Sequence, residues 1–162
     1  MSPTPVPRRR GVPSAAALRS VVVVVLLAGC SSLVEARPTP TPLDFGGIQG
    51  TLAHAGIALT NTVSGDAGCP DPNLIPTAIG FDASGLGVTT PVRVRIYIFT
   101  DRAAWQRRQP DVDSCIAAWA TDPATIETIG QSPYVVAGQG PWPAAFKTAV
   151  AGALKEAAGN GD

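Results

Sequence analysis

The chain has 162 residues, a length typical of one domain, and 45% of them are hydrophobic, which is enough for a core. Its 12 basic and 12 acidic side chains cancel, but four basic residues and no acidic residue lie before position 30. The rest of the chain therefore carries a net charge of −4, which argues against nucleic acid as the main partner because phosphate binding needs a basic surface.

The first 30 residues have the pattern of a signal peptide. Arg8, Arg9, Arg10 and Arg19 precede an apolar run over residues 21–28. A membrane-spanning helix needs roughly 20 apolar residues, so this run of eight is typical of a signal peptide that is removed. The run ends in the sequence L-A-G-C at positions 27–30. This motif resembles the lipobox of bacterial lipoproteins, in which a branched apolar residue and two small residues precede a cysteine.

The resemblance implies a covalent anchor on Cys30. The cysteine sulfur would form a thioether with a diacylglycerol carrying palmitate-type chains, and cleavage would remove residues 1–29 as a signal peptide. Each buried methylene adds about 0.8 kcal/mol to membrane binding, so two acyl chains make a stable anchor. The implied location is the extracytoplasmic face of a cell membrane, with no cofactor besides this lipid. An ordinary secretory signal followed by a chance cysteine is the alternative.

The segment after Cys30 is expected to be a tether. Residues 31–42 read SSLVEARPTPTP, which has three prolines in its last five positions and no helical period. Such a segment favours an extended, polyproline-like conformation. We therefore expect a lipidated tether over residues 30–42, a single folded domain over residues 43–158 and a disordered tail over residues 159–162.

The first half of the domain predicts one helix and three strands. Residues 43–55 place Phe45, Ile48 and Leu52 at helical spacing. Residues 57–63 and 77–83 are typical of strands, and the Gly- and Pro-rich residues 64–76 between them of a loop. The strongest strand pattern is VRVRIYIF over residues 92–99. One of its faces is apolar, and the other has two arginines followed by two aromatic residues.

The second half predicts shorter elements. Asp101 is a candidate N-cap for a helix over residues 102–109, which Pro110 is expected to end. A separate short helix over residues 111–120 follows, then a buried strand over residues 134–137. A turn over residues 138–143 leads into a final helix that ends near residue 158.

This order of elements predicts an α+β fold. We expect a small two-layer sandwich, with an antiparallel or mixed sheet of about four strands and helices on one face. A ferredoxin-like arrangement is one topology that fits.

Two cysteines remain once Cys30 is assigned to the lipid. An even pair in an exported protein predicts a disulfide between Cys69 and Cys115. A metal site is the competing interpretation, but the chain has no C-x-x-C motif and a single histidine. We expect no metal, and Asp111 and Asp113 are interpreted as solvated carboxylates rather than calcium ligands.

Two further features are candidate contacts. Trp142 lies between two prolines in a turn and is the best candidate for an exposed aromatic contact. Five of the eight basic residues after Cys30 lie within 16 positions, and they are candidates for an anion-binding or headgroup-binding patch. These residues are Arg93, Arg95, Arg102, Arg107 and Arg108. The favoured interpretation is a solvated face with local acidic partners, and the binding patch is the alternative.

Three functions follow from these observations. The leading hypothesis is a non-enzymatic, lipid-anchored extracytoplasmic domain that binds a protein or small molecule or serves an envelope role. The second is a small hydrolase-type enzyme that uses His54, although the G-x-S-x-G motif is absent. The third is an anion-binding or phospholipid-headgroup-binding module that uses the arginine cluster.

Overall fold

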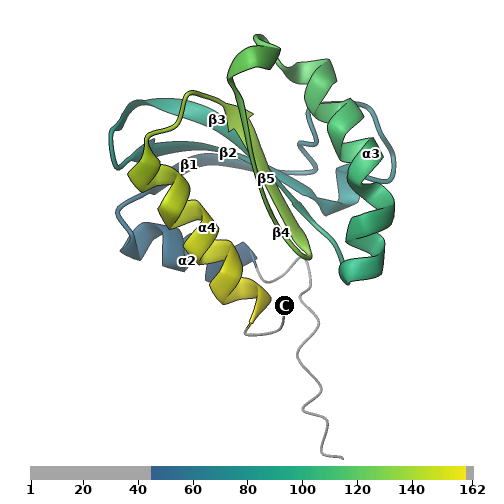
Figure 1. Ribbon diagram of the computed structural model, residues 1–162, viewed down its shortest axis with the longest axis horizontal. Coiled ribbons are helices and arrows are strands. Elements are labelled where there is room, and N and C mark those ends of the chain that lie inside the picture. The colour runs from purple at the N-terminus through teal and green to yellow at the C-terminus, as the bar shows by residue number, and fades with distance from the viewer. Residues whose placement is uncertain (1–44, 160–162) are drawn as a thin grey trace, which may run out of the picture. The chain divides into compact units, whose positions relative to one another are not determined.

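A computed structural model describes residues 45–159 of the chain (Figure 1). The expected signal peptide, Cys30 and the tether lie outside these residues, as does most of the expected tail. Within residues 45–159, every helix is too short or too polar to cross a membrane.

The described residues form an α+β fold around one five-stranded antiparallel sheet. The strands lie in the order β1-β2-β3-β5-β4. The elements in chain order are α2 (Phe45–His54), β1 (Ala58–Ser64), η2 (Ile75–Thr77), β2 (Ala78–Gly85), β3 (Val88–Ile98), α3 (Arg102–Trp119), η3 (Pro123–Thr125), β4 (Ile126–Gln131), β5 (Tyr134–Gln139) and α4 (Ala144–Ala158). The expected fold class is confirmed, but the order of elements is not the β-α-β-β-α-β of a ferredoxin-like fold.

Helices cover both faces of the sheet, and the expected single helical face is wrong. Figure 1 shows α2 and α4 on one side and α3 on the other. The side chains of Val94, Ile96 and Ile98 pack with α2 and α4. Tyr97 and Phe99 pack instead in a second core with α3, joined by Val135 of β5. Because β3 and β5 are apolar on both faces at this end of the sheet, each face needs its own cover.

Strand β4 is the element that sequence patterning missed. Its sequence, IETIGQ, has only two large apolar residues, Ile126 and Ile129, and they are three positions apart. That spacing does not follow the period of two that marks a strand. Pairing decides the conformation instead, because all six residues of β4 align with β5 in one continuous register.

Helix α3 is continuous through Pro110, so the expected break there is wrong. Asp101 caps the helix as expected, since its carboxylate accepts from the backbone N–H of Ala104 at 2.7 Å. Val112 and Cys115 in the second half are 0% and 2% exposed. We attribute the unbroken helix to this burial, which outweighs the backbone hydrogen bond that a proline removes.

The helices α2 and α4 bury the faces that their periodicity predicts. Phe45, Ile48 and Leu52 of α2 are buried against the sheet. In α4 the buried residues are Phe146, Val150, Ala153 and Leu154. This core closes one face of the sheet, so the polar side chains of the strands gather on the face that α3 covers.

Candidate functional site

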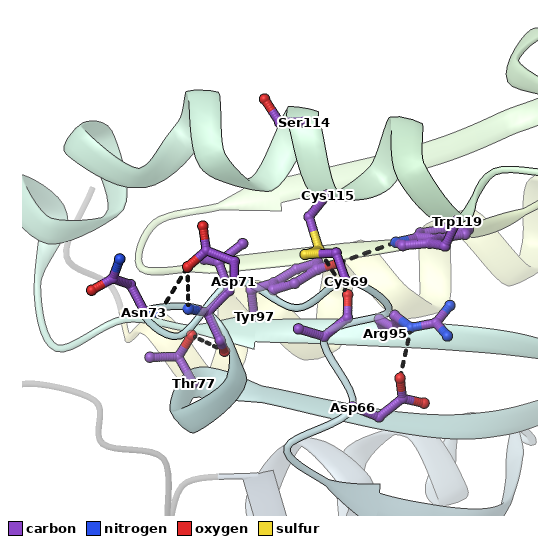
Figure 2. Close-up of a disulfide and its surroundings, with 12 residues drawn as sticks. Asp66, Cys69, Asp71, Asn73, Thr77, Arg95, Tyr97, Ser114, Cys115 and Trp119 are labelled. Carbon is purple, nitrogen blue, oxygen red and sulfur yellow. Dashed lines mark hydrogen bonds and ion pairs between the residues drawn. A yellow bond between two sulfur atoms is a disulfide. The ribbon is translucent and has the colours of Figure 1, made fainter.

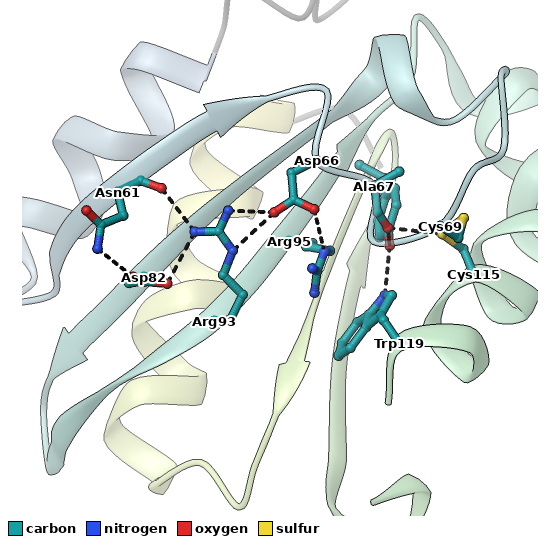
Figure 3. A network of polar contacts seen from close by, with 10 residues as sticks. Asn61, Asp66, Ala67, Cys69, Asp82, Arg93, Arg95, Cys115 and Trp119 are labelled. Carbon is teal, nitrogen blue, oxygen red and sulfur yellow. Dashed lines mark hydrogen bonds and ion pairs between the residues drawn. A yellow bond between two sulfur atoms is a disulfide. The ribbon is translucent and has the colours of Figure 1, made fainter. Parts of the chain in front are cut away.

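A network of charged side chains lies on the α3 side of the sheet, over strands β1 to β3 (Figure 3). Arg93 and Arg95 project from β3 on the same face, because they are two residues apart on a strand. Asp82 pairs with Arg93 across the β2–β3 ladder. Asp66 comes from the loop that follows β1, and it joins the two arginines.

Asp66 is the centre of this network. Its Oδ2 accepts from Nη2 of Arg93 at 2.5 Å and from Nε of Arg93 at 3.1 Å, which is a two-point contact. Its Oδ1 accepts from Nε of Arg95 at 3.1 Å. One carboxylate therefore orients two guanidinium groups.

All three guanidinium nitrogens of Arg93 donate hydrogen bonds. Its Nη1 donates to Asp82 Oδ1 at 3.2 Å and to the backbone oxygen of Asn61 at 3.0 Å. The Asn61 side chain in turn donates to Asp82 Oδ2 at 2.7 Å. With all three of its nitrogens in use, Arg93 serves as a structural cross-link between the β1–β2 region and the loop carrying Asp66.

The network shifts the pKa values of its acids. Burial acts to raise the pKa of Asp66, but hydrogen bonds and charge from Arg93 and Arg95 outweigh it, so the pKa lies below its usual value. The hydrogen bond from Asn61 is the main cause of a lowered pKa at Asp82. Burial acts to lower the pKa of Arg93, and its bonds to Asp66 and Asp82 reverse that and raise it. Both acids are therefore held in their charged form.

Two glycines make room for the network. A Cβ atom at Gly80 would overlap the Asp66 carboxylate and lie 2.6 Å from Nη2 of Arg93. A Cβ atom at Gly68 would overlap the Trp119 ring and lie 2.6 Å from Nε of Arg95. These positions require glycine because the charged side chains lie directly on the backbone.

Arg95 differs from Arg93 in how much of its guanidinium is used. Its side chain is only 14% exposed, and its carbon Cζ lies 4.7 Å from the centre of the Trp119 ring. Among the contacts of residues 45–159, Nε is the only nitrogen of Arg95 that donates a hydrogen bond, and its acceptor is Asp66. Figure 3 shows the two terminal nitrogens pointing away from Asp66. They form a fixed pair of donors at the edge of the network.

Two hydrogen bonds fix the position of the Trp119 side chain. Its indole Nε1 donates to the hydroxyl of Tyr97 at 3.3 Å, and that hydroxyl donates to the backbone oxygen of Ala67 at 2.9 Å (Figure 2). Tyr97 is 0% exposed, and this burial raises the pKa of its phenol. The indole ring is thus a positioned platform for Arg95.

The expected disulfide between Cys69 and Cys115 is present (Figure 2). The Cα atoms are 5.4 Å apart, within the normal range for a disulfide. The bond ties the loop between β1 and β2 to the second half of α3. That loop carries Asp66, so the disulfide helps to set the position of the charged network.

The five arginines of the predicted basic patch fall into two groups. Arg93 and Arg95 share Asp66 on the sheet. On α3, Arg108 pairs with Asp111 at 2.9 Å, one turn along the helix. Arg102 and Arg107 are exposed on α3. Acidic partners therefore neutralise Arg93, Arg95 and Arg108, as the interpretation of a face with local acidic partners predicts.

Trp142 is not an exposed contact, and that expectation is wrong. It is 3% exposed, its indole donates to the Gln139 backbone oxygen at 3.0 Å, and its ring meets Phe146 edge-on at 5.2 Å. A Cβ atom at Gly138 would lie 2.6 Å from the Trp142 ring, so this glycine lets the ring pack against the sheet. The Pro-rich turn folds inward for this reason.

His54, the candidate base, is exposed on α2. Its Nδ1 lies 2.8 Å from the backbone oxygen of Gly50, so this nitrogen donates a hydrogen bond within its own helix. Within residues 45–159, no group of three His, Cys, Asp or Glu side chains is placed to hold a metal ion.

Sequence analysis predicted only the two arginines of this site and missed their partners, above all Asp66 and Trp119. Asp66 lies 27 and 29 positions before the arginines it joins, inside a Gly- and Pro-rich loop. The available signal was the pair Arg93 and Arg95 on one face of a strand, which needs a nearby acid if it is partly buried.

Comparisons of the chain with known protein families, with curated protein sequences and with solved structures find no match.

Proposed function

We propose that this protein is a lipid-anchored binding domain on the extracytoplasmic face of a cell membrane, and that Arg95 recognises an anionic group of its partner. The observation that carries the proposal is the state of Arg95. Asp66 and Trp119 hold its guanidinium in place, and within the described residues its two terminal nitrogens donate to no other side chain.

A guanidinium group in this state is suited to a carboxylate or a phosphate. Its planar fork offers two parallel N–H donors that match the oxygens of either anion. Because Arg95 is already oriented, binding would order little additional side chain, and this lowers the entropic cost. Its low exposure also weakens competition from water.

The anchor and the location rest on separate observations. The L-A-G-C motif supports a diacylglycerol on Cys30 and removal of residues 1–29. The disulfide between Cys69 and Cys115 supports an oxidising compartment, where such bonds persist. The hydrolase alternative that uses His54 has no comparable support, because the described contact of its ring is to the backbone of its own helix.

An anion titration tests the role of Arg95. Inorganic phosphate and acetate are added separately to the full-length protein in neutral detergent, and the indole N–H signals of the three tryptophans are followed by NMR. We expect the Trp119 signal to shift and the Trp105 and Trp142 signals to stay. Arg95→Gln should abolish the shift, whereas Arg107→Gln, which removes an exposed arginine of α3, should preserve it.

Vesicles identify the source of the anion. Binding to phosphatidylglycerol vesicles that needs Arg95 would assign a lipid headgroup, and binding only to soluble anions would assign a soluble or protein-borne group. A Trp119 signal that neither anion moves, or that moves equally in Arg95→Gln, would refute the proposal.

A further inference from the structure

The two edges of the sheet differ in a way that points to a second binding surface. The register of β1 with β2 shifts between Thr60 and Val63, and Asn61 within this bulge has a φ of 49°. Bulges of this kind disturb an edge and discourage pairing with another strand. The other edge, β4, pairs with β5 over six consecutive residues without a shift. Its outer edge is therefore a regular template for an added strand.

A groove lies beside this edge, between β4 and α3. Its volume is about 190 Å³, which is below the 300–1,000 Å³ typical of small-molecule pockets and suits one or two side chains. Positions 113, 116 and 117 of α3 and its C-cap residue, Ala120, share one stripe because they are three and four residues apart. Ile126 and Thr128 contribute from β4, on the face that α3 covers. The remaining lining residue is Pro123.

The chemistry of the groove defines its occupant. The lining is mostly apolar, with Ile116, Ala117 and Ile126, and Asp113 is the only ionisable side chain among the seven that form it. A strand added to β4 would direct every second side chain to the α3 side. An apolar side chain would then enter the groove, and a lysine or arginine near it would meet Asp113.

We propose that β4 and this groove bind an extended segment of a partner protein by strand addition. β4 is the last strand of the sheet that residues 45–159 form. The segment would pair its backbone with the outer edge of β4, place an apolar side chain between α3 and β4, and carry a basic residue opposite Asp113. This mode takes affinity from main-chain hydrogen bonds and specificity from the groove. The groove lining shares no residue with the Arg95 network, so either proposal can fail without the other.

A peptide selection tests the proposal. A phage-displayed library of random heptapeptides is selected on the full-length protein in neutral detergent, and the most enriched peptide is synthesised. We expect alternating apolar residues and at least one lysine or arginine. On binding, hydrogen exchange of the β4 backbone amides should slow at least tenfold, while exchange of the β1 amides stays unchanged.

Two neighbouring alanines of α3 supply a matched pair of variants. Ala117→Trp fills the groove and should weaken the peptide at least tenfold, whereas Ala118→Trp, also exposed on α3 but outside the groove lining, should not. Asp113→Lys should turn the selection towards acidic peptides.

Several outcomes would overturn the proposal. These are a selection that enriches no peptide, protection that falls elsewhere than β4, or equal effects of the two tryptophan variants. A dimer in sedimentation that Ala117→Trp dissociates would also overturn it, because the groove would then be an interface between two copies of this chain.

Discussion

Arg95 lies over Trp119, with its guanidinium carbon 4.7 Å from the centre of the indole ring. The two residues come from different elements, β3 and α3. The apolar core beneath α3, the disulfide and the Ala67–Tyr97 hydrogen bond together hold the helix and the loop against the sheet. The stack orients the Arg95 guanidinium beside Asp66, whose carboxylate accepts a hydrogen bond from Nε of Arg95. Recognition and stability are therefore linked at this position, and variants near it should affect both.

Gly80→Ala should destabilise the protein, because the new Cβ atom would displace Asp66 from Arg93. We expect a loss of about 1–3 kcal/mol in the free energy of unfolding, measured by urea denaturation. Gly152→Ala is the matched control. That glycine has open space around it on the exposed side of α4, so the change should stabilise by up to about 1 kcal/mol. Equal effects of the two variants would contradict the steric argument.

Breaking the disulfide should lower stability and loosen the charged network. Replacing Cys69 and Cys115 by serine, or reducing them, should cost about 2–4 kcal/mol in the free energy of unfolding. The indole signal of Trp119 should broaden or move, because the loop below Arg95 loses its tie to α3. A reduced protein with unchanged urea midpoint and unchanged Trp119 signal would show that the bond is dispensable.

The lowered pKa values of Asp66 and Asp82 predict an acid-sensitive fold. In the folded state both acids hold their charge to lower pH than in the unfolded state, where an aspartate titrates near about 3.9. Their contribution to stability is therefore fully present above that pH and is lost as the pH falls through the folded values. As far as these two acids decide it, the urea midpoint of unfolding should not change between about pH 5 and 7. It should decrease once the pH is lower than about 4.

The variant Asp66→Asn tests whether Asp66 causes the loss of stability at low pH. It should lower stability at pH 7, because Arg93 and Arg95 lose their shared partner, and it should also reduce the slope of stability against pH below pH 4. A variant with the same acid slope as the unsubstituted protein would exclude Asp66 as a source of the pH dependence.

Pro110→Ala should raise stability. Pro110 is exposed inside α3, and the helix continues past it without the hydrogen bond that its nitrogen cannot donate. An alanine would supply that N–H and a better helix propensity, so we expect a gain of about 1–2 kcal/mol after allowing for the greater freedom of the unfolded chain. Thermal unfolding measures the change, and a lower midpoint would mean that the proline is required for the path of α3.

The anchor has its own prediction. Intact mass spectrometry of the protein extracted from its native membrane should give a chain that begins at Cys30 and carries a diacylglycerol. Cys30→Ala should abolish both lipid attachment and cleavage. A native chain without lipid would make the protein a secreted one, and this result would leave the Arg95 proposal unaffected.

Local pattern was enough to predict several elements of this fold. β3, α2 and α4 were predictable because their apolar residues repeat with the period of the element, which follows from backbone geometry alone. The N-cap at Asp101 was predictable for the same reason, since the cap and the N–H that it accepts are three residues apart. The cysteine pair was predictable by counting once Cys30 is assigned to the lipid.

Long-range contacts decided the rest. Strand β4 forms because β5 lies beside it, α3 passes through Pro110 because its second half is buried, and Trp142 turns inward because Gly138 leaves space. The largest difference concerns the arginines, which are close in sequence yet divided between a sheet network and a helix. Their partner Asp66 lies 27 residues before Arg93, and only chain folding brings opposite charges together over such a separation.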